Sequence, residues 1–134
     1  FSKILYSRYL EMARQCQRSD LQQKVDAFIA NHRPQNIHPP PQLDENITSE
    51  LLCRHKGLFY YYKGRRPLSA FNVFKLIVRQ EASRMSENDF LVINNVTEQL
   101  WKRSSPQEKM AYRNFTKSIN EILSQRVINF CFSF

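Results

Sequence analysis

Cationic and aromatic residues are concentrated in residues 54–66, where their combination favours binding of a polyanion. The cations and the accompanying histidine are Arg54, His55, Lys56, Lys63, Arg65 and Arg66. They flank the run Phe59-Tyr60-Tyr61-Tyr62, and no acidic residue lies among them. Cations neutralise phosphate and aromatic rings stack on bases, so the stretch predicts an arm that contacts DNA. The tyrosine-rich run also has strand propensity, and an arm packed on a neighbouring domain is an equal alternative.

Residues suited to catalysis or metal binding are few and widely separated. The histidines are His32, His38 and His55, and the cysteines are Cys16, Cys53 and Cys131. Neither set has the spacing of a metal site, a catalytic centre or a disulfide framework. The chain has two glycines, too few for a glycine-rich phosphate loop. We therefore expect no enzyme activity, no cofactor, no metal site and no small-molecule substrate.

Length and charge narrow the class of protein. A chain of 134 residues accommodates one domain with an extension. Its net charge of +8 favours nucleic acid or an anionic membrane surface as partner. Neither a membrane span of about 18 apolar residues nor a signal peptide is indicated, so we expect a soluble protein inside the cell, not a membrane protein.

The first half of the chain predicts a helical extension, a linker and the arm. Apolar residues recur at helical spacing within residues 1–33, and Ser19 or Asp20 is suited to cap a second helix, so two helices are expected. They either pack as a hairpin or bind a protein partner through residues 1–32. Residues 34–50 predict an extended proline-rich linker, with a short helix over residues 47–53. The basic and aromatic arm covers residues 51–64.

The second half predicts three helices within residues 65–126. Apolar periodicity indicates helices over residues 69–84 and 90–102, separated by a polar break at residues 86–89. Ser105, Pro106 and Glu108 have the order of a capping box, so a third helix begins there and continues at least to Leu123. Residues 127–134 form an apolar tail that either packs on the amino-terminal helices or stays exposed. The predicted fold class is all-α.

Residue types at fixed spacing in this second half resemble those of an HMG box. The matching positions are Arg66, Pro67, Ser69, Ala70, Phe71, Phe74, Trp101, Lys102, Ser105, Glu108, Lys109 and Tyr112. The resemblance implies an L-shaped three-helix box that binds the minor groove of double-stranded DNA and bends it. It also implies that Phe71, Phe74, Trp101 and Tyr112 are core aromatics at the corner of the L.

The resemblance further implies which residues contact DNA. They are Arg65, Arg66, Ser69, Phe71, Asn72, Lys75, Arg79, Phe90, Asn94 and Lys102. Many boxes have a bulky apolar wedge where this chain has Asn72, and some have a second wedge where it has Phe90. We therefore expect Phe90 to insert between bases, with a core or helix-staple role as the alternative. Ser69 and Phe90 favour binding without sequence preference, whereas Asn72 and Asn94 are suited to read minor-groove acceptors.

Three functions follow from this resemblance. One box with a non-box extension is similar to fungal mating-type regulators, which implies a transcriptional regulator in the nucleus. The first alternative is an architectural protein that bends or packages DNA without reading sequence, in the nucleus or the mitochondrion. The second is a helical protein-interaction module that has lost DNA binding, favoured by Asn72, by Glu98 in place of a familiar glycine and by the apolar tail.

Overall fold

Four α-helices and one short 3-10 helix make up the described part of the chain. The computed structural model describes residues 2–42 and 67–132, with side chains in the last helix described as far as Ile122 and at Ser124. The elements are α1 (Ser2–Asn31), η1 (Pro34–Asn36), α4 (Ala70–Arg84), α5 (Phe90–Arg103) and α6 (Pro106–Phe132). No strand occurs in these two ranges, so the all-α prediction is confirmed for them. The predicted helix at residues 47–53, the arm at residues 51–64, Arg65 and Arg66 lie outside the described residues.

Helices α4, α5 and α6 pack together, and we call them the three-helix unit. α4 contacts both α5 and α6. Ser69 caps α4, since its Oγ accepts a hydrogen bond of 3.2 Å from the Asn72 amide. Asp89 caps α5 in the same way, through a 3.0 Å hydrogen bond from the Leu91 amide. Both helices therefore begin where side-chain caps satisfy their free N–H groups, and their predicted positions are confirmed.

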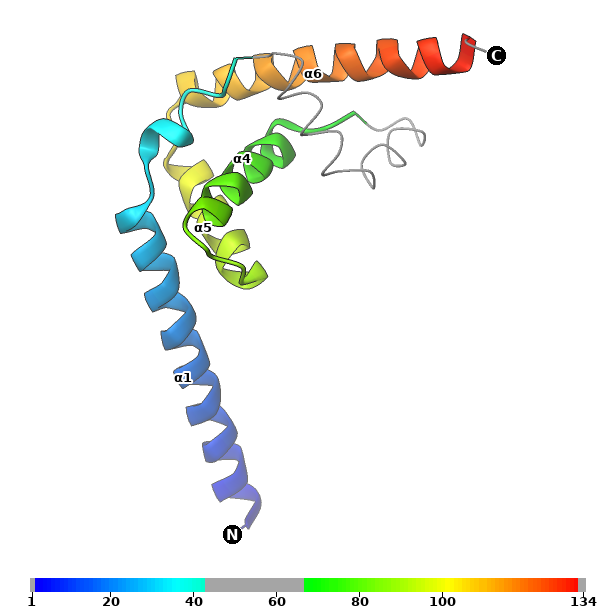
Figure 1. Cartoon of the computed structure of the whole chain (residues 1–134). Helices are drawn as coiled ribbons and strands as arrows, with labels where there is room; N and C mark the ends of the chain where they lie inside the picture. Colours follow the sequence, from blue (N-terminus) through cyan, green and yellow to red (C-terminus); the bar gives the residue numbers. More distant parts are fainter. Residues whose placement is uncertain (1, 43–66, 133–134) are drawn as a thin grey trace.

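Helix α6 begins with the predicted capping box. The Ser105 amide donates to Glu108 Oε1 at 2.9 Å, and the Glu108 amide donates to Ser105 Oγ at 3.1 Å. The helix continues to Phe132. Residues 127–132, predicted as part of a separate apolar tail, thus extend this helix, which projects from the unit toward the carboxyl end of the chain (Figure 1).

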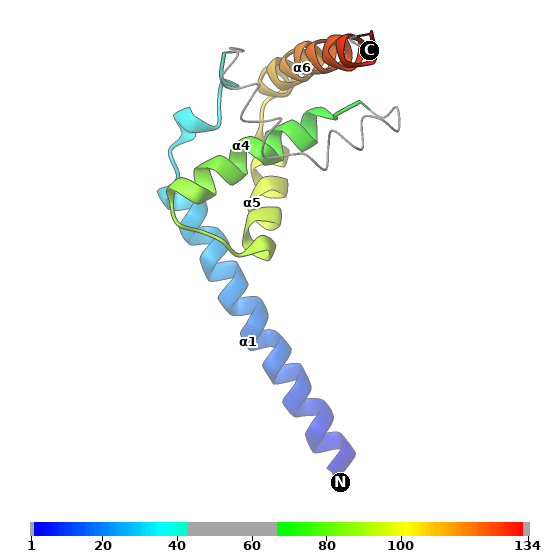
Figure 2. The same ribbon diagram turned by 45° about the vertical axis from the view of Figure 1, so that its right-hand side comes forward.

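Helix α1 is continuous, so the prediction of two helices broken near Ser19 is wrong. It runs from Ser2 to Asn31, and both Ser19 and Asp20 are exposed within it. Such polar side chains are tolerated inside a helix when they point to water. α1 packs on α5 near its carboxyl end, and its amino-terminal half projects beyond the three-helix unit (Figures 1 and 2).

The segment after α1 also packs on the three-helix unit. Val25 and Phe28 of α1 are 1% and 3% exposed, and Ile37, directly after η1, is 1% exposed. All three belong to the hydrophobic cluster that fills the interior of the unit. The Tyr112 hydroxyl donates a hydrogen bond to the Ile37 carbonyl oxygen. Ile37, which lies within the stretch predicted as an extended linker, is therefore part of the core, whereas residues 34–36 before it are exposed.

Candidate nucleic-acid interface

Four aromatic side chains meet at the centre of the three-helix unit. The Phe74 ring centroid lies 5.1 Å from that of Trp101 and 5.1 Å from that of Tyr112. Phe71 meets Trp101 edge to face at 6.0 Å. Phe74 and Tyr112 are fully buried, and edge-to-face contacts of this kind stabilise a core beyond the area they bury. Phe74 and Tyr112 are therefore core aromatics, as the resemblance implied, whereas Phe71 and Trp101 are only half-buried.

His38 lies against this aromatic centre, with its ring centroid 5.7 Å from that of Phe74 and 5.5 Å from that of Tyr112. The Ser104 hydroxyl donates to the Leu100 carbonyl at 2.8 Å, so the contact of 3.1 Å between Ser104 Oγ and His38 Nε2 requires the ring nitrogen to donate. His38 Nδ1 lies 3.6 Å from Glu108 Oε2. Burial lowers the pKa of His38 and outweighs the opposite effect of the Glu108 carboxylate. This histidine therefore packs against the aromatic centre, and its burial disfavours the charged form of the ring.

Phe90 lies at the surface between cations from the neighbouring helix. Its side chain is 57% exposed, which does not fit the alternative role as a core residue. Lys75 Nζ lies 5.3 Å and Arg79 Cζ 5.5 Å from the centroid of its ring. Because α4 packs on α5, three of the residues predicted to contact DNA form one cluster, which we call the Phe90 cluster.

The two cations of the Phe90 cluster repel each other. The pKa of Lys75 is lowered, chiefly because the group is partly desolvated and next because Arg79 is close, while Glu98 acts in the opposite direction. A phosphate placed near both cations would favour the charged form of Lys75. The cluster thus combines an exposed apolar ring with an electrostatic preference for an anion.

The predicted residues at the start of α4 have structural roles. Phe71 is half-buried against Trp101, so it belongs mainly to the aromatic centre. The Ser69 hydroxyl accepts the capping hydrogen bond, and its residue is exposed. The Asn72 side chain is exposed and makes no hydrogen bond to another described residue, so its amide faces water.

Two further predicted residues lie on α5. Asn94 is half-buried, and its Oδ1 is shielded from water and accepts no hydrogen bond from the described residues. Lys102 is exposed in the last turn of α5, where a cation favours the helix dipole. The structure does not bring Lys102 into the Phe90 cluster, since no contact joins it to the ring or its two cations.

Leu91 was not predicted to contact a partner, although it directly follows Phe90. It is 60% exposed, close to the value for Phe90. Its amide is held by the Asp89 cap, whereas its side chain points away from the buried face that Val92 and Ile93 supply. The sequence signal was available, because an apolar residue at the first turn of α5 falls outside the three-and-four pattern of the core.

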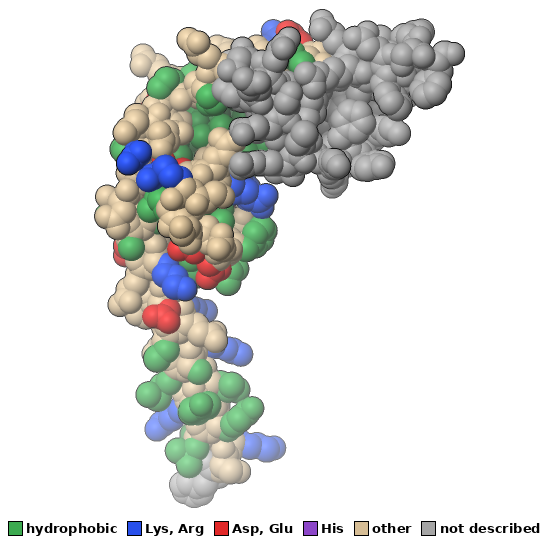
Figure 3. All heavy atoms as spheres, viewed as in Figure 1, with side chains coloured by type: hydrophobic (Ala, Val, Ile, Leu, Met, Phe, Trp, Pro, Cys, Tyr) green, Lys and Arg blue, Asp and Glu red, His purple; other side chains and the backbone are tan. Residues whose placement is uncertain are grey.

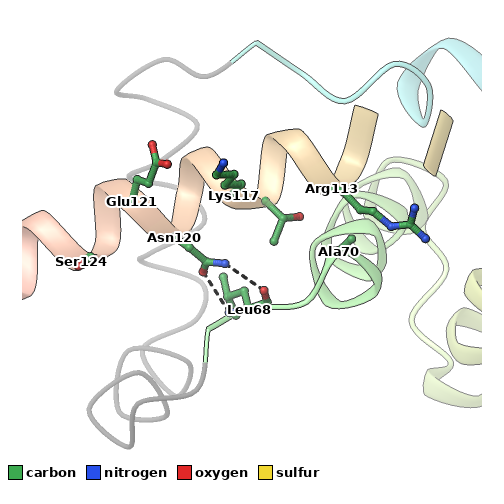
Figure 4. A pocket seen from close by; sticks show the side chains of 8 residues that line it. Leu68, Ala70, Arg113, Lys117, Asn120, Glu121 and Ser124 are labelled. Atoms are coloured by element: carbon green, nitrogen blue, oxygen red, sulfur yellow. Dashed lines mark hydrogen bonds between the residues drawn. The ribbon is translucent and has the colours of Figure 1, made fainter. Parts of the chain in front are cut away.

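A hollow of about 690 Å³ separates the entry of α4 from the middle of α6 (Figure 4). Asn120 joins its two sides, donating to the Leu68 carbonyl and accepting from the Leu68 amide, each at 3.0 Å. Arg113 and Lys117 of α6 line the hollow and are exposed. The sequence did not predict these two cations as site residues, because the residue pattern of α6 does not reveal which other segment lies beside the helix.

Metal-binding clusters and membrane-spanning helices are absent from the described residues. No group of three or more histidine, cysteine, aspartate or glutamate side chains there is placed to hold a metal ion. None of the helices described has the length and apolarity of a membrane crossing. Comparisons of the chain with protein-family models, with curated proteins and with solved structures found no match.

Proposed function

We propose that the chain binds double-stranded DNA in the minor groove and bends it, acting as a transcriptional regulator in the nucleus. The observation that carries this proposal is the exposed Phe90 ring between Lys75 and Arg79. The aromatic centre supports it as well, because its members stand at positions that resemble those of an HMG box. On this proposal the three-helix unit has the L shape of that family, with the Phe90 cluster on its DNA-binding face.

The proposed mechanism uses Phe90 as a wedge. Inserting an apolar side chain between base pairs costs a few kcal/mol of stacking energy. Burying the exposed part of a phenylalanine returns only about 1 to 2 kcal/mol, since a whole side chain contributes about 1.5 to 3. The wedge alone therefore does not offset the cost. Phosphate contacts by Lys75 and Arg79, which flank the ring, supply the remainder and hold the duplex in its bent form.

A second candidate function is an architectural protein that bends DNA without reading its sequence. The capping role of Ser69 favours it, because this hydroxyl already accepts a hydrogen bond from the backbone. Asn72 is then the exposed amide left at the start of α4, and the degenerate pattern of the minor groove gives it little sequence to distinguish. Equal affinity for A·T-rich and G·C-rich duplexes would favour this function over sequence-specific regulation.

The wedge is tested by measuring the bend angle of a duplex labelled at both ends, by fluorescence energy transfer. We expect Phe90→Ala to reduce the bend more than Asn72→Ala does. Met110→Ala is the matched control, because Met110 is also an exposed apolar residue, at 49%, but belongs to α6 and not to the cluster formed by α4 and α5. Circular dichroism verifies that each variant is folded. A larger effect of Asn72→Ala would contradict the assignment of Phe90 as the wedge.

The cations are tested by the salt dependence of affinity. Replacing both Lys75 and Arg79 by glutamine should reduce the slope of log affinity against log salt by about 2, since each phosphate contact contributes roughly 0.9. Mobility shifts on A·T-rich, G·C-rich and pre-bent duplexes at several salt concentrations provide the measurement. If the unmodified chain shows no salt-dependent binding to any of them, DNA binding is refuted and a protein-interaction module is favoured.

A further inference from the structure

The amino-terminal half of α1 has an apolar stripe that the three-helix unit does not cover. Leu5, Tyr9 and Met12 are 66%, 69% and 66% exposed, and Cys16 is exposed as well. Their spacing of four, three and four residues places them on one side of the helix. We call these four residues the α1 stripe. Figure 3 shows apolar side chains along this projecting half, with lysine and arginine side chains at its edges.

The α1 stripe faces away from the surface that packs on the three-helix unit. The α1 residues that pack there include Leu21, Val25 and Phe28, which follow Leu5, Tyr9 and Met12 by 16 positions each. At 3.6 residues per turn, a step of 16 residues turns about 160° around the helix axis. Docking of α1 on α5 therefore leaves the stripe free for another molecule.

We propose that the α1 stripe is the interface of a homodimer in which two α1 helices pair antiparallel. In this arrangement Tyr9 faces the partner's Met12, and Leu5 faces the partner's Cys16. A large side chain then meets a flexible or a small one at each position, which allows close packing. The same patch serves both chains, as two-fold symmetry requires. A parallel pair would instead place Tyr9 against Tyr9 and Cys16 against Cys16. The two tyrosines would then be overpacked, and the two cysteines would leave a gap.

The charged residues of this half of α1 are compatible with the pairing. Arg14 and Arg18 lie on the far side of the helix from the stripe, and both are exposed. Arg8 lies at the edge of the stripe, where the antiparallel arrangement places it near the partner's Gln15. No like charges are brought together across the pair, so the repulsion that would prevent self-association is avoided.

The area available fits a weak dimer. Exposed to about two-thirds, each large side chain of the stripe offers on the order of 100 Å², and Tyr6 beside it is 66% exposed. Two chains would bury about 1,000 Å² in total, which is near the lower limit for a specific interface. We therefore expect an association that depends on protein concentration.

Sedimentation equilibrium of the full chain over a wide concentration range tests the dimer. The unmodified chain should be monomeric when dilute and dimeric when concentrated. Leu5→Glu combined with Met12→Glu should weaken the dimer at least tenfold. Ile4→Glu is the matched control, since Ile4 is 62% exposed but lies off the stripe, and it should leave the dimer unchanged. A chain that stays monomeric throughout, or a dimer that the double variant does not weaken, would overturn the proposal.

Disulfide crosslinking tests the orientation. In a chain carrying Cys53→Ser and Cys131→Ser, Leu5→Cys should crosslink under mild oxidation to Cys16 of the second copy, as peptide mass spectrometry would identify. Crosslinks that join Cys16 to Cys16 would refute the antiparallel pair. Binding of the monomeric chain to vesicles of anionic phospholipid, lost in the Leu5→Glu and Met12→Glu variant, would assign the stripe to a membrane surface and overturn the dimer.

Discussion

Replacing Ile37 by alanine tests whether the segment after α1 belongs to the core of the three-helix unit. Ile37 is 1% exposed and belongs to the same hydrophobic cluster as the interior of the unit. Truncating a buried isoleucine to alanine costs about 2 to 5 kcal/mol, because apolar contacts are lost and a cavity remains. A residue in a solvated linker would change stability by no more than about 0.5 kcal/mol. The stability loss expected if Ile37 is a core residue thus exceeds the loss expected for a linker residue by more than the error of an unfolding measurement.

We expect Ile37→Ala to lower the free energy of unfolding by about 3 kcal/mol, and Tm by roughly 10 °C for a domain of this size. Urea unfolding followed through the fluorescence of Trp101, the single tryptophan of the chain, measures the change. Asn36→Ala is the control, because Asn36 precedes Ile37 directly and is exposed. An unchanged m-value, the slope of the unfolding free energy against urea concentration, would confirm that both variants unfold in the same way. A loss below about 1 kcal/mol would refute the core assignment of Ile37.

The hydrogen bond from Tyr112 to Ile37 gives a second measure of the same attachment. Tyr112→Phe keeps the ring but leaves the Ile37 carbonyl oxygen without its partner, which should cost about 1 to 3 kcal/mol. Since the two side chains share one attachment, combining Tyr112→Phe with Ile37→Ala should cost less than the sum of the single changes. Simple additivity would contradict the coupling that the structure indicates.

Two further predictions concern stability. Because burial lowers the pKa of His38 below 6.5, the unfolded chain binds more protons than the folded chain, so stability should be highest above pH 6.5 and fall as the pH drops through this range. His38→Gln should flatten that fall in urea midpoints measured between pH 5 and pH 8, and an unchanged pH profile would refute the role of His38. Asn120→Ala removes both hydrogen bonds to Leu68 and should cost about 2 kcal/mol in thermal unfolding, whereas the exposed Asn114→Ala should change little. Equal effects of the two asparagine variants would contradict the role of Asn120.

The helix boundaries of the three-helix unit could be predicted because each depends on a few neighbouring residues. Ser105 and Glu108 lie three positions apart, and the capping box they form requires no contact with the rest of the chain. The same holds for Ser69 at the start of α4. The contact of Phe71 with Trp101 could not be derived from such local rules, and the resemblance to a family implied only that both residues are core aromatics.

Contacts between segments far apart in sequence were beyond local reasoning. The prolines of residues 34–41 disfavour helix and strand, so the sequence predicts an extended linker. They do not reveal whether another part of the chain lies beside them and packs against them. Ile37 shows no periodicity with its neighbours that would mark it as a core residue. Likewise, the exposure of Phe90 depends on how α5 packs on α4, and its spacing within α5 fits a buried side chain as well as a wedge.

The apolar face of α1 changes near Ser19, where a helix break was predicted because Ser19 or Asp20 is suited to cap a second helix. The stripe of Leu5, Tyr9 and Met12 ends there, and the apolar residues that follow return on nearly the opposite side of the helix. Such a shift arises when a turn separates two helices, or when the two halves of one continuous helix present apolar residues to different surfaces. A turn would require a second helix nucleus and would leave unpaired N–H and C=O groups at two new ends, whereas an uninterrupted helix avoids both costs. The position read as a break is therefore where α1 passes from the face free for a partner to the face that holds it on the three-helix unit.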